Sequence, residues 1–189
     1  MSESESKLFV ISGPSGAGKG TLVARVRDRV PGLGLTVSAT TRQPRAGEID
    51  GVNYYFLTDE EFSRRVDEGQ FVEWAQVHAH RYGTLVSEVE SKLADGHSLI
   101  LEIDVQGALN VKRRFPDAVL VFVEPPSLEV LRERLVGRGT ETPESVELRL
   151  ANAEHELSLA DRYDVRIVND DLEEATVSLA DVLQNYERN

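Results

Sequence analysis

Residues 7–21 read KLFVISGPSGAGKGT, an apolar run that leads into a glycine-rich loop with a lysine near its end. The run 7–12 has the length and composition of a buried β-strand, and a helical pattern follows over residues 19–30. A strand, a glycine-rich loop and a helix in this order are typical of a P-loop, whose backbone N–H groups and helix N-terminus surround phosphate oxygens. We therefore expect these residues to bind the phosphates of a nucleoside triphosphate: Gly13, Pro14, Ser15, Gly16, Ala17, Gly18, Lys19, Gly20 and Thr21.

The end of this loop departs from the general P-loop pattern at one position. The residue after the lysine is usually Ser or Thr, whose hydroxyl contacts Mg²⁺, but here it is Gly20 and the hydroxyl comes one residue later, at Thr21. We expect Mg²⁺ as the cofactor, in contact with Thr21 or held through water alone. Lys19 is expected to place a positive charge on the β- and γ-phosphates. A plain glycine turn is the alternative interpretation, which the combination of strand, helix, lysine and glycines disfavours.

Strand and helix patterns alternate along the rest of the chain. Further short apolar runs at 98–103 and 118–123 predict strands, and the less apolar run at 164–168 (DVRIV) predicts a fourth. Residues 105–114, 127–136, 143–160 and 171–186 predict helices. This alternation favours an α/β fold with a mostly parallel central sheet between two layers of helices, the three-layer fold of P-loop NTPases.

Residues 35–84 interrupt this alternation with a different composition. They are rich in Thr, Tyr, Gly and Arg and contain short alternating runs such as 70–77, in which Phe71 and Trp74 are expected in a core. Thr58 and Glu61 have the spacing of a capping box, which predicts a short helix. We interpret the region as a small mixed α/β insert.

The overall composition limits the class of protein. The chain has 189 residues, a formal net charge of -12 and no cysteine, so disulfides and cysteine metal sites are excluded. A polyanion would be repelled by this charge, whereas a small anion can still bind a local arginine cluster. With no signal-peptide pattern and no membrane-spanning run, we expect a cytoplasmic protein with no nucleic acid, membrane or obligate protein partner.

Residues 38–55 (SATTRQPRAGEIDGVNYY) carry the strongest candidate for a second phosphate site. Arg42 and Arg45 lie three apart around a proline, and a guanidinium matches phosphate oxygens better than an ammonium does. Tyr54 could donate to the same phosphate. A solvated basic loop is the alternative, and it is less attractive in a chain this acidic.

Several motifs, in a fixed order over nearly the whole chain, resemble those of guanylate kinases. The resemblance implies Mg²⁺-dependent, in-line transfer of the γ-phosphoryl group of ATP to GMP, and also to dGMP, giving ADP and GDP for purine nucleotide metabolism. The motifs are the segment from Ser38 to Tyr54, Phe71-Val-Glu73-Trp-Ala, Arg81-Tyr82-Gly83-Thr84, Leu101-Glu-Ile-Asp104-Val-Gln-Gly107, Pro125-Pro-Ser127, Arg134-Leu-Val-Gly-Arg138-Gly-Thr and Val168-Asn169-Asp-Asp171.

By the same resemblance, matching residues take roles in the two nucleotide sites. The GMP phosphate would be held by Arg42, Arg45, Tyr54 and Tyr82, and guanine would be read by Ser38, Glu73 and Thr84, with Glu102 near the base or ribose and Asp104 near GMP and a metal-bound water. Asn169 matches the residue on the adenine side of ATP. The catalytic residues would be Lys19, Arg42, Asp104 and the arginines of a closing lid, Arg134, Arg138 and Arg149.

The chemistry of guanine supports this assignment. Guanine presents N1–H and N2–H₂ donors side by side, which one carboxylate such as Glu73 can accept, and a hydroxyl of Thr84 or Ser38 can donate to O6. Adenine lacks the N1 proton and would leave the carboxylate unpaired. The residues alone leave simpler interpretations open: Glu73 as a solvent-facing strand residue, and Asp104 as a cap of helix 105–114. Arg132, which the motifs do not single out, is expected to pair with a surface acid, Glu133, Glu141 or Glu144.

The expected organisation is a single guanylate-kinase-like domain over residues 1–189. Its parts are a core with the P-loop (1–34), the GMP-binding insert (35–88), core (89–128), a helical lid (129–158) and core (159–189). Two rival functions remain at this point. One is a non-catalytic protein-binding module on the same fold, which would tend to lose the lysine or the lid arginines. The other is a P-loop kinase with an acceptor such as AMP or CMP, which the Glu73 and Thr84 pattern disfavours.

Overall fold

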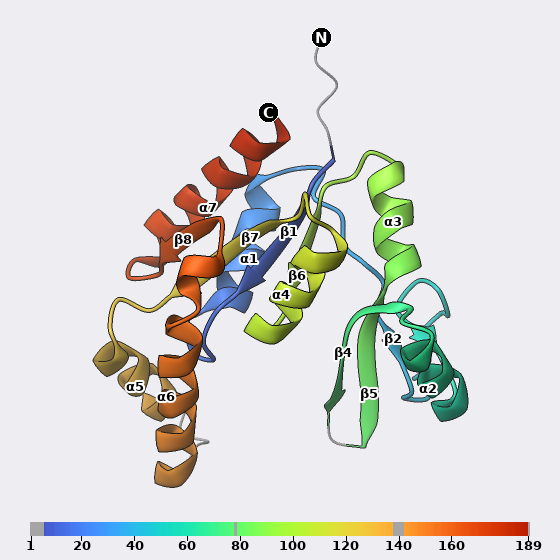
Figure 1. The fold of residues 1–189 in the computed structure, drawn as a ribbon, viewed down its shortest axis with the longest axis horizontal. Helices are drawn as coiled ribbons and strands as arrows, with labels where there is room; N and C mark the ends of the chain where they lie inside the picture. Colours follow the sequence, from blue (N-terminus) through green and yellow to red (C-terminus); the bar gives the residue numbers. More distant parts are fainter. Residues whose placement is uncertain (1–5, 78, 138–141, 189) are drawn as a thin grey trace.

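A parallel sheet forms the centre of the protein (Figure 1), as a computed structural model that describes residues 6–77, 79–137 and 142–188 shows. Its strands are β1 (Leu8–Ser12), β6 (Leu99–Glu102), β7 (Val119–Glu124) and β8 (Val165–Val168), in the order β6-β1-β7-β8. All three pairings are parallel. The four core strands and the mostly parallel sheet predicted from the sequence are therefore confirmed.

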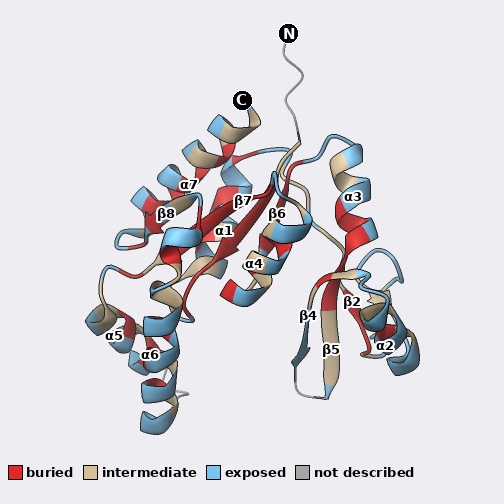
Figure 2. Cartoon of the chain, in the orientation of Figure 1, coloured by how far each residue is buried: buried red, intermediate tan, exposed pale blue. Residues whose placement is uncertain are grey.

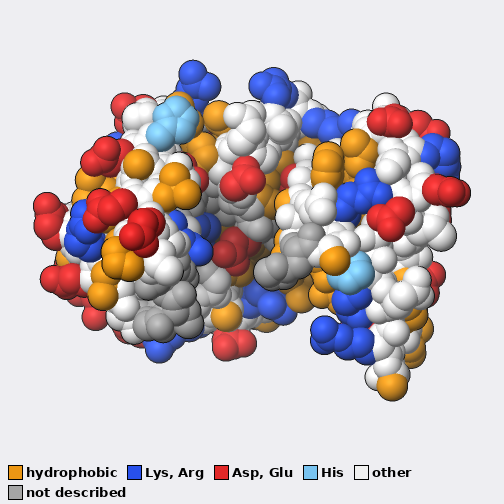
Figure 3. All heavy atoms as spheres, turned by 90° about the horizontal axis from the view of Figure 1, so that it is seen from below, with side chains coloured by type: hydrophobic (Ala, Val, Ile, Leu, Met, Phe, Trp, Pro, Cys, Tyr) orange, Lys and Arg blue, Asp and Glu red, His pale blue; other side chains and the backbone are white. Residues whose placement is uncertain are grey.

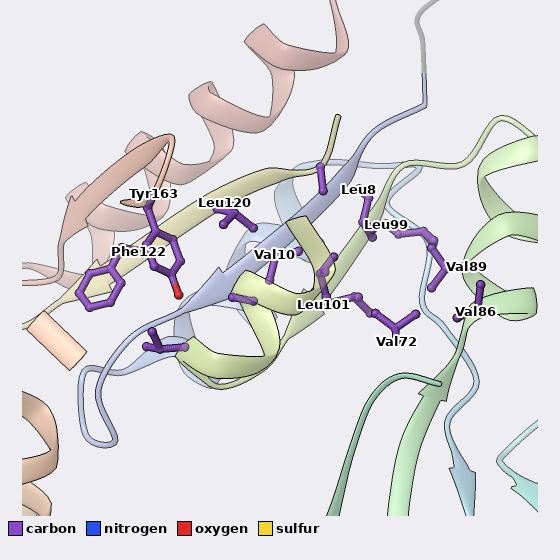
Figure 4. Close-up of a cluster of buried hydrophobic side chains, with 14 of the residues drawn as sticks. Leu8, Val10, Val72, Val86, Val89, Leu99, Leu101, Leu120, Phe122 and Tyr163 are labelled. Carbon is purple, nitrogen blue, oxygen red and sulfur yellow. The ribbon is translucent and has the colours of Figure 1, made fainter. Parts of the chain in front are cut away.

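Helices cover both faces of this sheet. In β1, Phe9 and Ile11 pack with α1 (Lys19–Arg29) and α7 (Leu172–Glu187), whereas Leu8 and Val10 pack with α3 (Val86–Ala94) and α4 (Val105–Arg114). Because successive side chains of a strand point to opposite faces, a continuous apolar strand needs both layers to bury it. The central strands β1 and β7 are buried along nearly all of their length in Figure 2, and Figure 4 shows the cluster on the α4 side. This is the three-layer α/β fold that the sequence predicts.

The region from residue 39 to residue 85 forms a second sheet of its own. Its strands are β2 (Ala39–Thr40), β3 (Tyr55–Phe56), β4 (Phe71–Val77) and β5 (His80–Leu85), in the order β3-β2-β5-β4, with β2 and β3 parallel and the other pairs antiparallel. The helix α2 (Asp59–Asp67) begins where the capping box predicts, since the Thr58 hydroxyl accepts the Glu61 N–H at 3.1 Å.

Aromatic residues hold α2 against this sheet. Phe62 is fully buried and stacks on Phe71, with 4.4 Å between the ring centroids. The expected burial of Trp74 is wrong: its side chain is 45% exposed and meets Phe62 only edge-on. The reason is that β4 belongs to a small sheet, in which little covers the second half of this strand.

Two helices on the far side of the molecule form a separate hairpin. The helices α5 (Leu128–Gly137) and α6 (Pro143–Leu157) bury their own small cluster, which includes Leu131, Leu135 and Leu150. Arg132 forms a surface ion pair, as expected, but its partner is Glu147 on the facing helix and not one of the three acids named from the sequence. Of those three, Glu141 lies outside the described residues. A 3₁₀ turn (Ala160–Arg162) then leads back to β8. None of the helices in the described ranges is long and apolar enough to cross a membrane.

Candidate active site

The glycine-rich loop leaves the carboxyl end of β1 and wraps the start of α1. Gly13 and Gly18 have φ values of 139° and 88°, in a region that residues with a Cβ rarely adopt. A Cβ on Gly13 would also collide with the carbonyl oxygen of Val123 in the neighbouring strand β7. The loop is thus held close against the sheet, so only glycine fits at its first position.

Positively charged groups gather at the loop. The first turn of α1 contains no acidic residue, and its free N–H groups and the positive end of the helix dipole face the loop. The Lys19 ammonium donates to the carbonyl oxygens of Gly13 and Pro14, at 2.6 Å and 2.9 Å. The ammonium therefore lies across the same loop whose amides are expected to hold phosphate.

Gly20 and Thr21, the two residues after the lysine, face different surroundings. A Cβ on Gly20 would lie 3.6 Å from both carboxylate oxygens of Glu102, at the end of β6. Thr21 instead lines a hollow of about 190 Å³ together with Arg134 and Asn169. The carboxylate at the sheet edge thus lies beside the position where the general P-loop pattern has its hydroxyl.

Asn169 connects the loop with β8 and α5. Its side chain is buried, and the amide donates to the Ala17 carbonyl oxygen at 2.8 Å. The Asn169 carbonyl oxygen in turn accepts from Arg134 at 2.8 Å, and its backbone N–H donates to Glu124. These bonds fix one wall of the hollow that Thr21 lines.

Arg149 reaches the loop from α6. Its guanidinium donates to the Ser15 hydroxyl at 2.7 Å, across 134 residues of sequence. Two of the three predicted lid arginines, Arg134 and Arg149, therefore lie at the P-loop side of the site. The third, Arg138, lies outside the described residues.

Arg42 is held in place by an acid and two aromatic rings. Its guanidinium donates to Glu48 at 2.8 Å and lies 5.4 Å from the centre of the Tyr54 ring, which meets Tyr82 edge-on at 6.1 Å. The bond to Glu48 raises the pKa of Arg42, and the bonds from Arg42 and from the Arg45 backbone lower the pKa of Glu48. Arg45 contributes its backbone N–H to Glu48 at 2.7 Å, while its side chain is exposed.

Glu73 and Thr84 face each other across β4 and β5. They are register partners, and the Thr84 hydroxyl donates to Glu73 at 2.8 Å. Burial raises the pKa of the Glu73 carboxyl, the Thr84 bond opposes this, and the Asp104 carboxylate adds to it. Ser38 lies on the neighbouring segment, where its carbonyl oxygen accepts the Tyr55 N–H at 2.9 Å. A carboxylate sheltered in this way favours ligands that donate hydrogen bonds to it.

Glu73 and Asp104 border the same hollow between the two sheets. The hollow has a volume of about 290 Å³ and lies between β4 and the start of α4. Seen from below in Figure 3, a recess separates the α5–α6 side from the side of the second sheet, with basic and acidic side chains along it. Asp104 also accepts the Gly107 N–H at 2.6 Å, so the expected cap of the helix is confirmed.

A model of the guanylate kinase family matches residues 5–186. The chain belongs to this family. It is 53% identical to the guanylate kinase of Gloeobacter violaceus over 94% of this chain and 87% of the relative, and 49% identical to that of Rubrobacter xylanophilus over 94% and 93%. The crystal structure of guanylate kinase from Anaplasma phagocytophilum matches with a TM-score of 0.69 and 33% identity, over 100% of this chain and 90% of that one.

Membership of the guanylate kinase family confirms the resemblance, the P-loop kinase fold and the classification as a nucleotide-binding transferase. The chain is therefore a kinase of this family, whose reaction is the ATP-dependent phosphorylation of GMP. The family assignment disfavours both the binding module and the kinase for AMP or CMP, since the curated relatives bear the name of an enzyme and that name is guanylate kinase.

Some contacts of the site in this guanylate kinase family member were missed at the sequence level. Glu48 lies inside the quoted motif, but nothing in its spacing indicates that it would bind Arg42. Glu88 is buried on α3 and accepts bonds from the Val37 N–H and the Tyr55 hydroxyl, at 3.0 Å and 2.8 Å, which ties the second sheet to the core. No motif marks Glu88 in the sequence, so only the tertiary structure reveals its role.

Proposed function

We propose that this chain transfers the γ-phosphoryl group of ATP directly to GMP, and to dGMP, with Mg²⁺, giving ADP and GDP. The supporting observation is that a phosphate cradle and a sheltered base-reading acid meet at the same sheet edge. Glu102 lies beside Gly20 of the cradle, and Asp104, two residues later, borders the hollow with Glu73. The two nucleotides would thus approach each other over the end of β6, where ligands bind in open α/β sheets.

The donor nucleotide is proposed to occupy the P-loop side. Backbone amides of the loop and Lys19 would hold the phosphates of ATP, and Asn169 and Arg134 would border its adenosine beside the 190 Å³ hollow. Lys19 exchanges its two carbonyl partners for phosphate oxygens, which carry full negative charge and bind an ammonium more strongly.

The acceptor phosphate is proposed to bind at Arg42, Arg45, Tyr54 and Tyr82. Glu48 and the ring of Tyr54 already fix the plane of the Arg42 guanidinium, so little side-chain freedom remains to be lost when phosphate binds. Arg45 is exposed and can move onto the phosphate. Arg42 would thus be a fixed contact of the phosphate and Arg45 a movable one.

The guanine-reading contacts follow from the hydrogen-bond inventory. A hydroxyl has a single hydrogen, and that of Thr84 is used on Glu73. Glu73 can still accept N1–H and N2–H₂ of guanine, because a carboxylate offers about four lone-pair positions. We therefore propose that the Ser38 hydroxyl donates to guanine O6, whereas Thr84 holds the Glu73 carboxylate in its orientation.

Glu102, whose carboxylate lies beside Gly20, and Asp104 offer hard oxygen ligands that fit Mg²⁺, directly or through water. The Thr21 hydroxyl is a further hard ligand, but it lines the separate 190 Å³ hollow. Within the described ranges, no three His, Cys, Asp or Glu residues gather into a group able to hold a metal ion by themselves. The nucleotide phosphates would thus supply the remaining ligands. When bound, the ion neutralises charge on the β- and γ-phosphate oxygens.

Positioning and charge neutralisation carry the proposed mechanism. Residues 35–88 would close as the GMP-binding insert and residues 129–158 as the lid, which excludes water and protects ATP from hydrolysis. Arg134 and Arg149, with Arg138, would then face the equatorial oxygens of the moving phosphoryl group. No side chain acts as a covalent nucleophile, because the GMP phosphate itself attacks in line.

The direct test compares two acceptors in a coupled assay of ADP formation. Purified protein with ATP and Mg²⁺ is expected to form ADP rapidly with GMP and poorly with AMP, and not without Mg²⁺. The reason is that adenine would leave Glu73 without its donors. Equal rates with the two acceptors would remove the guanine assignment, and no acceptor-dependent ADP at all would favour a non-catalytic module.

A second prediction concerns Arg45, the movable contact of the acceptor phosphate. Arg45→Ala is expected to raise KM for GMP by about 10-fold to 100-fold, because one charged hydrogen-bond partner of the phosphate is lost. ATP affinity, measured by fluorescent-nucleotide displacement, should change little. Arg64→Ala on the exposed face of α2 is the matched control. A collapse of ATP binding in Arg45→Ala would refute the division into donor and acceptor sides.

A further inference from the structure

Asn169, the residue directly after β8, turns its side chain toward the P-loop. It is only 5% exposed, and its amide donates to the carbonyl oxygen of Ala17 at 2.8 Å, across 152 residues of sequence. A carbonyl oxygen can only accept hydrogen bonds, so the –NH₂ side of the amide must be the side that faces Ala17. The chemistry of the acceptor therefore fixes the orientation of this amide.

The same amide packs against the next residue of the loop. A Cβ on Gly18 would lie 2.4 Å from the side-chain nitrogen of Asn169, which is far inside van der Waals contact. Gly18 also has a φ of 88°, so contact and backbone conformation both require glycine at this position. The amide nitrogen is thus enclosed between Ala17 and Gly18, and the end of β8 is in direct contact with the loop.

The bond to Ala17 sets the direction of one N–H group of the loop. The Ala17 C=O and the Gly18 N–H belong to the same trans peptide unit, which is planar, so the two groups point in opposite directions. With the carbonyl held on Asn169, the Gly18 N–H is held pointing away from it. Gly18 is the N-cap of α1, directly before Lys19, where backbone N–H groups are expected to meet phosphate oxygens.

Asn169 is itself held from two further sides, as a positioning group requires. Its backbone N–H donates to the carbonyl oxygen of Glu124, the last residue of β7, at 2.8 Å. Its own carbonyl oxygen accepts from Arg134 of α5, also at 2.8 Å. The edge of the central sheet therefore fixes the Asn169 amide, and the amide fixes the end of the loop.

These contacts restrict how the side chain could read a base. An amide distinguishes adenine best by donating and accepting at the same time, to neighbouring acceptor and donor atoms of the base. In Asn169 the –NH₂ side faces Ala17 and lies against Gly18, so this paired contact is not open to it. The resemblance to guanylate kinases places the residue on the adenine side of ATP, whereas the geometry directs its amide to the loop.

We propose that Asn169 is a positioning residue, which holds the Gly18 N–H in the direction of the donor phosphates and does not select the donor base. It acts on the phosphates through Ala17 and Gly18. The inference rests on the proposed binding of the ATP phosphates by this loop. It requires that loss of the amide weaken every ligand held by its phosphate chain, whichever base the ligand carries.

Two substitutions of similar size remove the amide donor. Asn169→Leu is neutral and Asn169→Asp adds a negative charge, so a loss that both share is due to the missing hydrogen bond. The Kd values for ATP, CTP and inorganic tripolyphosphate, measured by displacement of a fluorescent ATP analogue, are expected to rise by a common factor of about 10-fold. The ratio of the ATP and CTP values should not change. Asn152→Leu and Asn152→Asp, at an exposed position of α6, are the matched controls and should bind all three ligands as wild type does.

The contrary outcomes are distinct from one another. A rise for ATP alone, with CTP and tripolyphosphate unchanged, would overturn the proposal and make Asn169 an adenine contact. Unchanged values in Asn169→Leu would also overturn it, and a rise in Asn169→Asp alone would then be due to charge repulsion. GMP affinity should stay within about 2-fold of wild type, so a parallel loss of GMP binding with a lower Tm would refute a local role. Failure of the proposed function would appear separately, as absence of GMP-dependent ADP formation in the unsubstituted protein.

Discussion

Lys19→Met is expected to lower kcat by about 10³-fold while the protein remains folded. Methionine has nearly the length of lysine, so the substitution removes the charge without opening a space. The lost interaction is one that strengthens as negative charge moves from the γ-phosphoryl group toward the β-phosphate, and such interactions affect kcat more than KM. Steady-state kinetics with ATP and GMP measure the loss, and thermal unfolding reports on the fold.

The controls for this prediction are chosen by position. Lys92→Met replaces a lysine of α3, outside the loop and its neighbours, and should leave kcat unchanged. Lys19→Arg keeps a positive charge but introduces a planar fork in a loop shaped by Gly13 and Gly18, so it should recover only a small part of the rate. A Lys19→Met enzyme with a rate close to wild type would exclude Lys19 from phosphoryl transfer.

The central fold could be predicted because its physical signals are local and repeated. Strands β1, β6 and β7 each contain a short, continuous apolar run, and only burial on both faces satisfies such a run. Phe9 and Val10 thus predict two helical layers before any tertiary contact is known, and the two core clusters follow this alternation. Gly13 and Gly18 likewise follow from the turn that a phosphate cradle requires.

The remaining features depend on contacts between distant segments, which periodicity does not encode. Trp74 was expected in a core, but β4 belongs to a small sheet that leaves this side chain 45% exposed. Glu73, in the same strand, has the local pattern of a surface residue and is sheltered by segments distant in the sequence, with Thr84 of β5 opposite it and the start of α4 across the hollow. Sequence patterns likewise do not predict that Gly20 lies beside Glu102 or that Arg149 bonds to Ser15, because these residues meet only in the folded protein.

Glu73→Gln is expected to lower kcat/KM for GMP by roughly 10²-fold to 10⁴-fold. The amide offers one acceptor oxygen in place of two and presents N–H₂ toward the guanine donors, so one donor of guanine meets another donor. ATP binding should be unchanged, because the contact lies between β4, β5 and the 290 Å³ hollow rather than at the P-loop. Glu90→Gln, an exposed acid of α3, is the control. Unchanged discrimination between GMP and AMP would place guanine recognition elsewhere.

Glu73→Gln, which should lower kcat/KM for GMP, should not lower the stability of the fold. Burial raises the pKa of Glu73 in the folded state, so the ionised carboxylate opposes folding above its unfolded pKa. At pH 7, Glu73→Gln should therefore be at least as stable toward urea as wild type. As the pH falls through the raised pKa, the folded protein takes up the proton and the penalty disappears, so the difference between the two proteins should shrink. If the stability advantage of Glu73→Gln over wild type instead grew as the pH fell, the Glu73 charge would stabilise the fold. If Glu73→Gln keeps its stability but loses the use of GMP, the carboxylate serves recognition at a cost in folding free energy.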